Sequence, residues 1–235
     1  MKYVSIISAL FVFNHITAAT QIKAQILNEM AFWAQQYSEH AELASRFSQN
    51  KSLINEGMLL EKKINAFRSK LNINDKAVAE FNQISNDMKK YQNKVKSSLK
   101  KDSADPTVKI KIDLLDHMNL ETDYAQKKAN GKKFSKSEEI KFWSTEHEGE
   151  AKVMAAFMNP DAPELKDEAE DIASELSSTR SIWSPNAEPV QKANEELNEM
   201  ALAFERTPNL NNIPAKLAKH EERERKRAAQ ILAQL

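Results

Sequence analysis

The residues of this chain that could do chemistry are histidines and glutamates placed four positions apart on helical stripes. His117 and Glu121 stand in LLDHMNLETDY, and His220 and Glu224 stand in LAKHEERERKR, 103 positions later. Residues at such spacings share one face of an α-helix, and the apolar residues around each pair extend that same face. A buried imidazole or carboxylate without a partner is costly. The repeated pairs therefore indicate metal ligation as the leading explanation.

Composition restricts the chemistry further. The chain has 235 residues, of which 41% are hydrophobic and 29% charged, with only 3 glycines, a composition typical of a mostly helical protein. It contains no cysteine, so disulfides, zinc–thiolate sites, iron–sulfur clusters and thiol nucleophiles are excluded. Basic and acidic residues number 34 each, so the net charge is zero. We therefore expect no nucleic-acid partner, and the charge indicates no anionic membrane surface.

The first twenty residues, MKYVSIISALFVFNHITAAT, have the pattern of a secretory signal peptide. A basic start is followed by an apolar run over residues 3–13 and by the small residues Ala18 and Ala19. This run is too short to span a bilayer comfortably. We expect cleavage after Ala19, a secreted or periplasmic mature protein, and no stable membrane association after cleavage. The alternative is a buried first helix in a cytoplasmic protein.

Proline residues and stretches rich in Asn or Ser divide the mature chain into helical segments. Strand-type alternation is absent from the sequence. SKSE at Ser135–Glu138 predicts a capping box at a helix start, and Gly131 predicts a helix end. The eight predicted helices span about residues 21–47, 53–71, 76–100, 107–128, 135–158, 163–177, 188–206 and 214–235.

The two halves of the mature chain resemble each other. The motif Glu-x-x-Phe-Trp begins at Glu29 and again at Glu139, 110 positions later, and the His/Glu pairs repeat near the end of each half. This repeat predicts an all-α protein made of two tandem up-and-down four-helix bundles. The expected division is a signal peptide over residues 1–19, a first bundle over 20–131 and a second bundle over 132–235.

The candidate ligands of the first bundle are expected at similar depths along their helices. His40 lies about eight residues, or roughly 12 Å, before the end of its helix. Glu61 on the next helix and His117 on the fourth lie near the same depth if neighbouring helices run up and down. The expected first site consists of His40, Glu61, His117 and Glu121.

The second bundle offers a related set with an altered member. Alignment of the two Phe-Trp motifs places Glu150 opposite His40, and His147 lies one turn earlier on nearly the same face. Glu168 lies at a depth similar to that of Glu61. The expected second site consists of His147, Glu150, Glu168, His220 and Glu224.

Imidazole and carboxylate ligands without thiolates suit iron, manganese or zinc. Four such ligands can hold one ion, and a pair of ions would need more carboxylates. Each feature also has a purely structural interpretation. A single His–Glu pair is usually a hydrogen bond, Trp33 and Trp143 are expected in the core, and Glu29 and Glu139 can pair within the bundle.

At these motifs the chain resembles an uncharacterised bacterial family of ferritin-like proteins built from two tandem four-helix bundles. EMAFWAQQYSEHA matches the family's Glu, Phe-Trp and His-Ala motif, with His40 at the motif histidine. LLDHMNLE and LAKHEERE match its His-x-x-x-Glu motif in the fourth and eighth helices. The chain departs from the family in its export signal and at Glu150, which replaces the second motif histidine. The resemblance implies a ferritin-like fold and metal binding, but no established reaction.

The sequence therefore favours an exported ferritin-like protein that binds a transition metal without turnover. One alternative is an oxidase or peroxide-handling enzyme, in which iron or manganese with an open coordination position activates oxygen species. The other is a metal-free helical interaction protein, in which the His/Glu pairs only fix the register of the bundle. The identity and number of the ions, any reaction and any protein partner are left open by the sequence.

Overall fold

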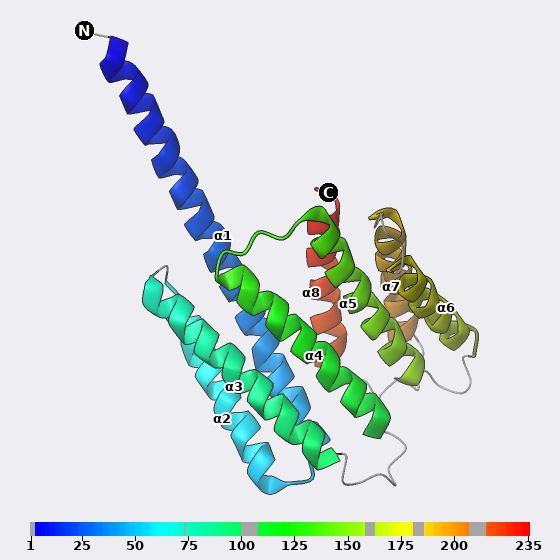
Figure 1. Ribbon diagram of the computed structural model, residues 1–235. Helices are drawn as coiled ribbons and strands as arrows, with labels where there is room; N and C mark the ends of the chain where they lie inside the picture. Colours follow the sequence, from blue (N-terminus) through cyan, green and yellow to red (C-terminus); the bar gives the residue numbers. More distant parts are fainter. Residues whose placement is uncertain (1–2, 73, 100–107, 158–162, 181–185, 207–214) are drawn as a thin grey trace.

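The computed structural model describes residues 3–72, 74–99, 108–157, 163–180, 186–206 and 215–235 (Figure 1). Within these ranges the secondary structure consists of eight α-helices and no strand, which confirms the all-α prediction. The helices are α1 (Tyr3–Phe47), α2 (Lys51–Ser69), α3 (Asp75–Leu99), α4 (Val108–Ala129), α5 (Lys136–Phe157), α6 (Pro163–Thr179), α7 (Glu188–Arg206) and α8 (Ala215–Leu232).

Local sequence explains where several helices begin and end. The side chain of Asn50 accepts a hydrogen bond from the backbone N–H of Ser52 at 2.9 Å and so caps the start of α2. At the start of α5, Ser135 and Glu138 each accept a hydrogen bond from the other's backbone N–H, at 3.2 and 2.8 Å. This is the predicted capping box. After α4, Gly131 adopts a φ of 78°, a left-handed conformation that ends helices.

The helices of each half pack against one another, as expected for helical bundles. In the first half α1 packs against α2, α3 and α4, and in the second half α5 packs against α6, α7 and α8. The halves meet where α4 packs against α5 and where α1 packs against α8 (Figure 1). The first and last helices of each half therefore form the middle of the molecule, and α2, α3, α6 and α7 flank them.

Buried side chains follow helical stripes. The buried residues of α2 are Gly57, Leu60, Ile64 and Phe67, which recur at the three- and four-residue spacing of one helix face. Trp33 and Trp143 from the repeated motif are completely buried, as expected for core residues.

The internal repeat reappears in the contacts between the halves. Glu29 on α1 accepts a hydrogen bond from Arg227 on α8, and Glu139 on α5 accepts one from Tyr124 Oη on α4 at 2.5 Å. Glu139 follows Glu29 by 110 positions and Arg227 follows Tyr124 by 103, the same offsets that relate the sequence motifs. The last helix of each half thus contacts the first helix of the other half at equivalent positions. This gives the middle of the molecule an approximate two-fold symmetry.

Helix α1 begins earlier than predicted. It runs without interruption from Tyr3, so the segment predicted to be a signal peptide continues into the first bundle helix, and its N-terminal part projects beyond the other helices (Figure 1). None of the helices is long and apolar enough to span a membrane, as judged over the described part of the chain.

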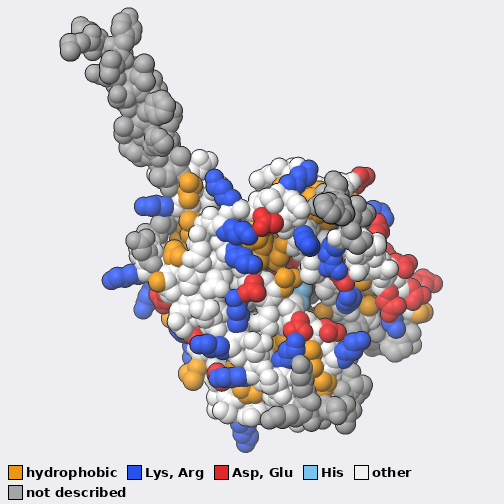
Figure 2. All heavy atoms as spheres, viewed as in Figure 1, with side chains coloured by type: hydrophobic (Ala, Val, Ile, Leu, Met, Phe, Trp, Pro, Cys, Tyr) orange, Lys and Arg blue, Asp and Glu red, His pale blue; other side chains and the backbone are white. Residues whose placement is uncertain are grey.

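Charge on the surface is distributed unevenly. Lys, Arg, Asp and Glu alternate over most of the face shown in Figure 2, whereas acidic side chains gather over α6. The exposed acidic residues of this helix include Glu164, Asp167, Glu168, Glu170 and Asp171.

Candidate metal centre

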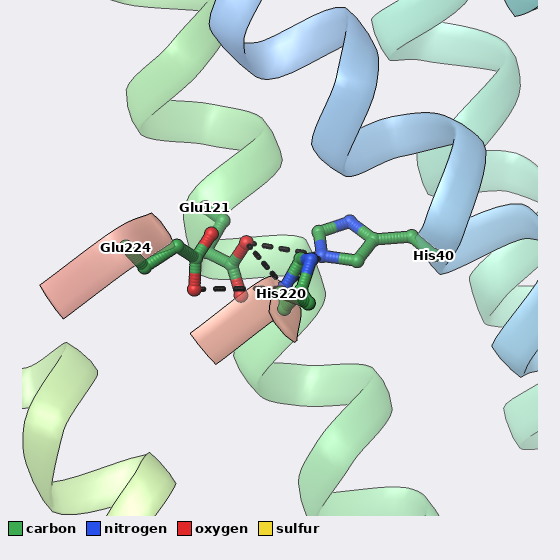
Figure 3. Close-up of side chains that lie close together, drawn as sticks. All are labelled: His40, Glu121, His220 and Glu224. Atoms are coloured by element: carbon green, nitrogen blue, oxygen red, sulfur yellow. Dashed lines mark hydrogen bonds and ion pairs between the residues drawn. The ribbon is translucent and has the colours of Figure 1, made fainter. Parts of the chain in front are cut away.

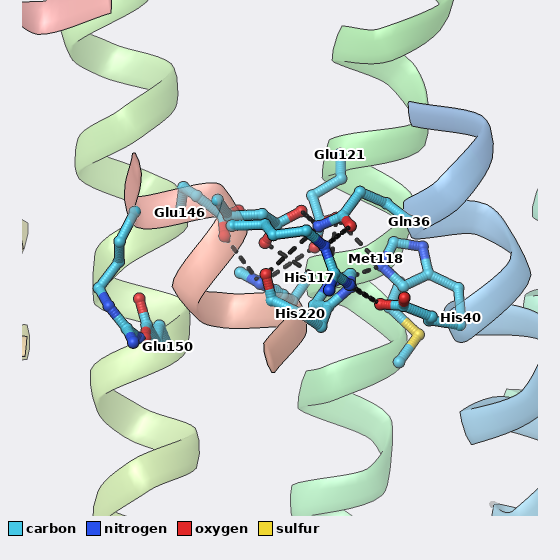
Figure 4. A network of polar contacts seen from close by, with 12 residues as sticks. Gln36, His40, His117, Met118, Glu121, Glu146, Glu150 and His220 are labelled. Carbon is cyan, nitrogen blue, oxygen red and sulfur yellow. Dashed lines mark hydrogen bonds and ion pairs between the residues drawn. The ribbon is translucent and has the colours of Figure 1, made fainter. Parts of the chain in front are cut away.

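Three histidines and four glutamates meet in the interior between α1, α4, α5 and α8 (Figure 4). Each of these side chains is at most 7% exposed. Every one of the four central helices supplies at least one of them. The set comprises His40 from α1, His117 and Glu121 from α4, Glu146 from α5, and His220, Glu221 and Glu224 from α8.

The first group of ligand atoms, which we call the histidine-rich group, consists of His40, Glu121, His220 and Glu224 (Figure 3). The Nε2 atoms of His40 and His220 lie 3.1 Å apart. Glu121 Oε2 lies 3.1 Å from His40 Nε2 and 3.9 Å from His220 Nε2. Glu224 Oε2 lies 3.5 Å from His220 Nε2. The four side chains therefore point at one small volume from three helices.

The second group, which we call the carboxylate-rich group, consists of His117, Glu146, Glu221 and Glu224. His117 Nε2 lies 3.0 Å from Glu146 Oε1 and 3.1 Å from Glu121 Oε1. Glu224 thus belongs to both groups, and Glu121 directs one oxygen at His40 and the other at His117. These two carboxylates connect the groups.

The separations within each group match those of ligands around one metal ion. Ligand atoms bound at about 2.1 Å and subtending 90–110° lie roughly 3.0–3.4 Å apart, and opposite ligands lie about 4.2 Å apart. In both groups all the ligand atoms lie within 4.8 Å of one another, and the closest approaches are 3.0 and 3.1 Å. Each group could therefore hold one ion without rearrangement of the helices.

Several of these buried atoms find no hydrogen-bond partner among the described residues. They include both carboxylate oxygens of Glu121 and of Glu146, Nε2 of His117, and Oε2 of Glu221 and of Glu224. An unsatisfied buried polar atom costs about 1–3 kcal/mol, and more if it is charged. Close approach without hydrogen-bond geometry is what a set of ligands for a shared cation requires. The donor set thus fits a metal.

Neighbouring polar side chains orient two of the ligands. Glu39 Oε2 lies 3.2 Å from His220 Nδ1 and also pairs with Arg223. A carboxylate on Nδ1 favours the tautomer in which Nε2 carries the free lone pair, and Nε2 is the atom that faces His40. The Nε2 of Gln36 donates to Glu224 Oε1 at 2.8 Å, which leaves Oε2 directed at the centre.

Electrostatics differ among the carboxylates. Burial raises the pKa of Glu224, Glu221 and Glu146, and neighbouring carboxylates raise it further. Burial also acts to raise the pKa of Glu121, but His40 and His117 outweigh it and lower that pKa below its ordinary value. Glu121 is therefore the carboxylate most fully ionised in the absence of a metal.

The imidazoles also differ. Burial lowers the pKa of His220. Burial would lower the pKa of His117 as well, but Glu146 and Glu121 raise it well above its ordinary value. Without a metal, His117 is thus held as an imidazolium by the carboxylates around it.

The arrangement differs from the expectation of one site in each bundle. His40, His117 and Glu121 were expected together, and His220 with Glu224, but the structure joins all five in a single centre between the halves. Since α1 packs against α8 and α4 against α5, each half completes the ligand set of the other.

Glu61 and Glu168 lie outside this centre. Glu61 is only partly buried, because it stands one residue, or about 100° of helix rotation, from the buried position Leu60. Glu168 is exposed on α6, one residue before the buried Ala169. Neither belongs to a group of candidate ligands, so similar depth along the bundle was an insufficient guide.

His147 and Glu150 are buried beside the centre but belong to neither group. Glu150 pairs with the guanidinium of Arg225, which is itself buried, and His147 Nδ1 lies 3.7 Å from Glu150 Oε2. Arg225 Nε also donates to Asn198 Oδ1 at 2.7 Å. Arg225 therefore compensates the charge of Glu150 and engages its carboxylate in an ion pair.

Sequence reasoning missed Glu146 and Glu221. Each stands directly beside a histidine rather than four positions from one, so the four-residue His/Glu spacing does not identify them. Their helical register could have revealed them. Glu146 follows the buried Trp143 by three positions, and Glu221 precedes the buried Ala228 by seven.

Comparison with known proteins does not identify the chain: no protein-family model matches the sequence, and a search of the curated proteins finds no significant match.

Gly149 on α5 gives His117 the space that it occupies. A Cβ atom added at Gly149 would lie 2.5 Å from His117 Nδ1 and 3.2 Å from its Cε1. By the internal repeat, Gly149 corresponds to Glu39, 110 positions earlier, and His117 corresponds to His220. The equivalent contact in the other half is therefore the pair of Glu39 with His220 Nδ1. Here a glycine lets the imidazole approach the helix backbone instead.

We expect Gly149→Ala to destabilise the protein, although Ala is favoured over Gly by about 1 kcal/mol in a helix interior. The new methyl group would force the His117 ring out of position. In a His117→Ala background the same change should instead stabilise the protein by about 1 kcal/mol. Denaturant unfolding of the four proteins of this double-mutant cycle measures the difference. Equal effects of Gly149→Ala in both backgrounds would show that the ring does not depend on this glycine.

Proposed function

We propose that this chain is a ferritin-like protein that binds two transition-metal ions, one in the histidine-rich group and one in the carboxylate-rich group. The observation that carries the proposal is the concentration of buried imidazole and carboxylate atoms that approach one another to 3.0–3.1 Å, several of them without a hydrogen-bond partner among the described residues. Glu121 and Glu224 would help to hold both ions, because Glu121 lies close to a histidine of each group and Glu224 belongs to both groups.

Charge supports two ions rather than one. Four buried carboxylates carry four negative charges when ionised, and the three imidazoles of the set are neutral when they act as ligands. Two divalent cations balance this charge, whereas with a single one two of the carboxylates must keep a proton or remain as uncompensated charges in the interior. Buried charges are retained in proteins only when they are paired or bound to a metal.

The ligand types support iron, manganese or zinc. Imidazole binds iron and zinc well, and carboxylate oxygens suit manganese. Ligands that project inward from facing helices are also the way in which ferritin-like proteins build carboxylate-bridged centres, usually with Glu-x-x-His motifs on two helices. Here the motifs are instead His-x-x-x-Glu on α4 and His-Glu-x-x-Glu on α8, which is likeness in arrangement rather than in sequence.

The test is metal content. Protein purified without chelator, or reloaded with Fe²⁺, Mn²⁺ or Zn²⁺ after chelation, should contain close to two ions per chain by elemental analysis. Glu224→Gln should lower this content sharply, because Glu224 belongs to both groups. Glu222→Gln is the matched control, since Glu222 lies on the same helix but is exposed and pairs with Lys226.

Failure of the wild-type protein to bind any of these ions would contradict the proposal and favour the metal-free interaction protein. Equal loss from both variants would show that the binding is not at this centre.

Metal uptake should release protons. Because the pKa values of Glu146, Glu221 and Glu224 are raised, these groups hold protons in the folded metal-free protein above the ordinary pKa of a glutamate. That protonation stabilises the metal-free fold at low pH, and the contribution is lost as pH rises through the raised pKa values. A bound cation requires the ionised form, so metal affinity should rise with pH over the same range. Titration of metal into weakly buffered protein with a pH indicator measures the release; proton-free binding would contradict it.

We further propose that the chain is exported and cleaved after Ala19, on the basis of the signal pattern in its first residues. The mature protein from bacterial expression should then begin at Thr20, as read by N-terminal sequencing of the periplasmic fraction. Ala19→Arg should block cleavage because the position before the cut requires a small residue, whereas Ala18→Arg, one position earlier, should not. Intact chain beginning at Met1 in the cytoplasm would contradict export.

A further inference from the structure

The two groups of ligands differ in their donor atoms. The histidine-rich group offers two imidazole nitrogens, from His40 and His220, and two carboxylates. The carboxylate-rich group offers one imidazole, from His117, and three carboxylates, and an oxygen of Glu121 lies 3.1 Å from that imidazole. Both groups are buried and share Glu224, so the donor set is the difference between them that a bound ion would experience most directly.

The internal repeat shows where this difference arises. The residue at the position equivalent to His40 is Glu150, whose carboxylate pairs with Arg225. No second imidazole therefore reaches the carboxylate-rich group from α5. The position equivalent to Gln36 is Glu146, which supplies a carboxylate in its place. The same holds between α4 and α8, where Glu221 stands at the position equivalent to Met118. Glu121 and Glu224 are thus equivalent by the repeat, whereas the candidate ligands around them differ between the two groups.

We propose that the two positions select different ions: a borderline ion such as Zn²⁺ or Fe²⁺ in the histidine-rich group, and a harder ion such as Mn²⁺ in the carboxylate-rich group. This inference rests on the proposed function, since it concerns the ions of the same centre. It goes beyond that function by assigning a kind of metal to each position and an order of loading. The protein then holds a mixed-metal pair rather than two equivalent ions.

The chemical reason is the match between ligand and ion. Imidazole suits zinc and iron, whereas carboxylate and water oxygens suit manganese. Zn²⁺ also binds most nitrogen and oxygen sites more tightly than Mn²⁺, so it should enter the histidine-rich group first. In the carboxylate-rich group carboxylates replace nitrogen donors, which reduces the advantage of Zn²⁺ over Mn²⁺ there.

Competition between two metals tests the selection in the wild-type chain. Protein loaded with two equivalents of Mn²⁺ is titrated with one equivalent of Zn²⁺, and released and retained Mn²⁺ are measured by elemental analysis and electron paramagnetic resonance. Zn²⁺ should displace one of the two Mn²⁺ equivalents. The carboxylate-bridged Mn²⁺ pair should then give way to the spectrum of a magnetically isolated Mn²⁺.

Diffraction data collected at the zinc and manganese absorption edges locate each ion directly. Zinc should lie between His40 and His220, and manganese beside His117 and Glu146. Both elements mixed at both positions, or release of both Mn²⁺ equivalents by one equivalent of Zn²⁺, would overturn the selection while leaving two-ion binding intact. Absence of both metals would instead refute the proposed function.

Two variants assign the positions independently. His40→Gln removes an imidazole from the histidine-rich group alone, and the first zinc-binding step should weaken by at least about tenfold, the lower end of the effect produced by disturbing even the outer partners of metal ligands. Glu221→Gln alters the carboxylate-rich group alone. It should weaken retention of Mn²⁺ in the mixed-metal protein and leave the first zinc step within about twofold of wild type. The same change in both steps for both variants would show that the positions are not distinct.

Discussion

Four glutamate side chains lie in contact with three histidines in the interior, where water cannot compensate their charge. An isolated ionised carboxylate is strongly disfavoured in such surroundings, and several of them in contact repel one another as well. Protons can relieve part of this cost, which is why burial raises the pKa of Glu146, Glu221 and Glu224. The imidazoles of His40 and His117 compensate another part, since they lie 3.0–3.1 Å from oxygens of Glu121 and Glu146. Divalent cations held by these side chains, as proposed, would relieve the repulsion that remains.

The centre also connects the two halves of the fold. In an independent four-helix bundle the ligands converge inside that bundle, but here α1 and α4 of the first half and α5 and α8 of the second each supply at least one. The approximate symmetry explains how this arises. The last helix of each half lies against the first helix of the other, as the contacts Glu29–Arg227 and Tyr124–Glu139 show. The candidate ligands on α4 and α8 thereby face each other across the junction, so the proposed metal binding would involve the same side chains as the docking of the halves.

The sequence predicted the helices closely but grouped the candidate ligands differently from the structure. Helical periodicity, the capping box at Ser135 and the terminator Gly131 are local signals, so helix boundaries fell within a few residues of those observed, apart from the start of α1. The sequence also identified the buried candidate ligands His40, His117, Glu121, His220 and Glu224, because polar residues on buried stripes are visible in sequence. Their grouping depends on how the halves dock, which no local signal encodes. The same dependence explains why Glu61 was included and Glu146 was missed.

Arg225 illustrates how a repeated unit can lose equivalence without losing its fold. A perfectly repeated chain would place the same ligand on α1 and α5, and the centre would hold two equal ions. Here the position on α5 carries Glu150, and a buried guanidinium from α8 neutralises it. The guanidinium of Arg225 is planar and suited to binding a carboxylate through a fixed fork, so this pair compensates the charge of Glu150 inside the protein. Glu150 is therefore held in this ion pair. Glu146, one turn earlier on α5, is the candidate ligand from this helix. Divergence at a few positions on α5 and α8 thus converts structural symmetry into chemical asymmetry.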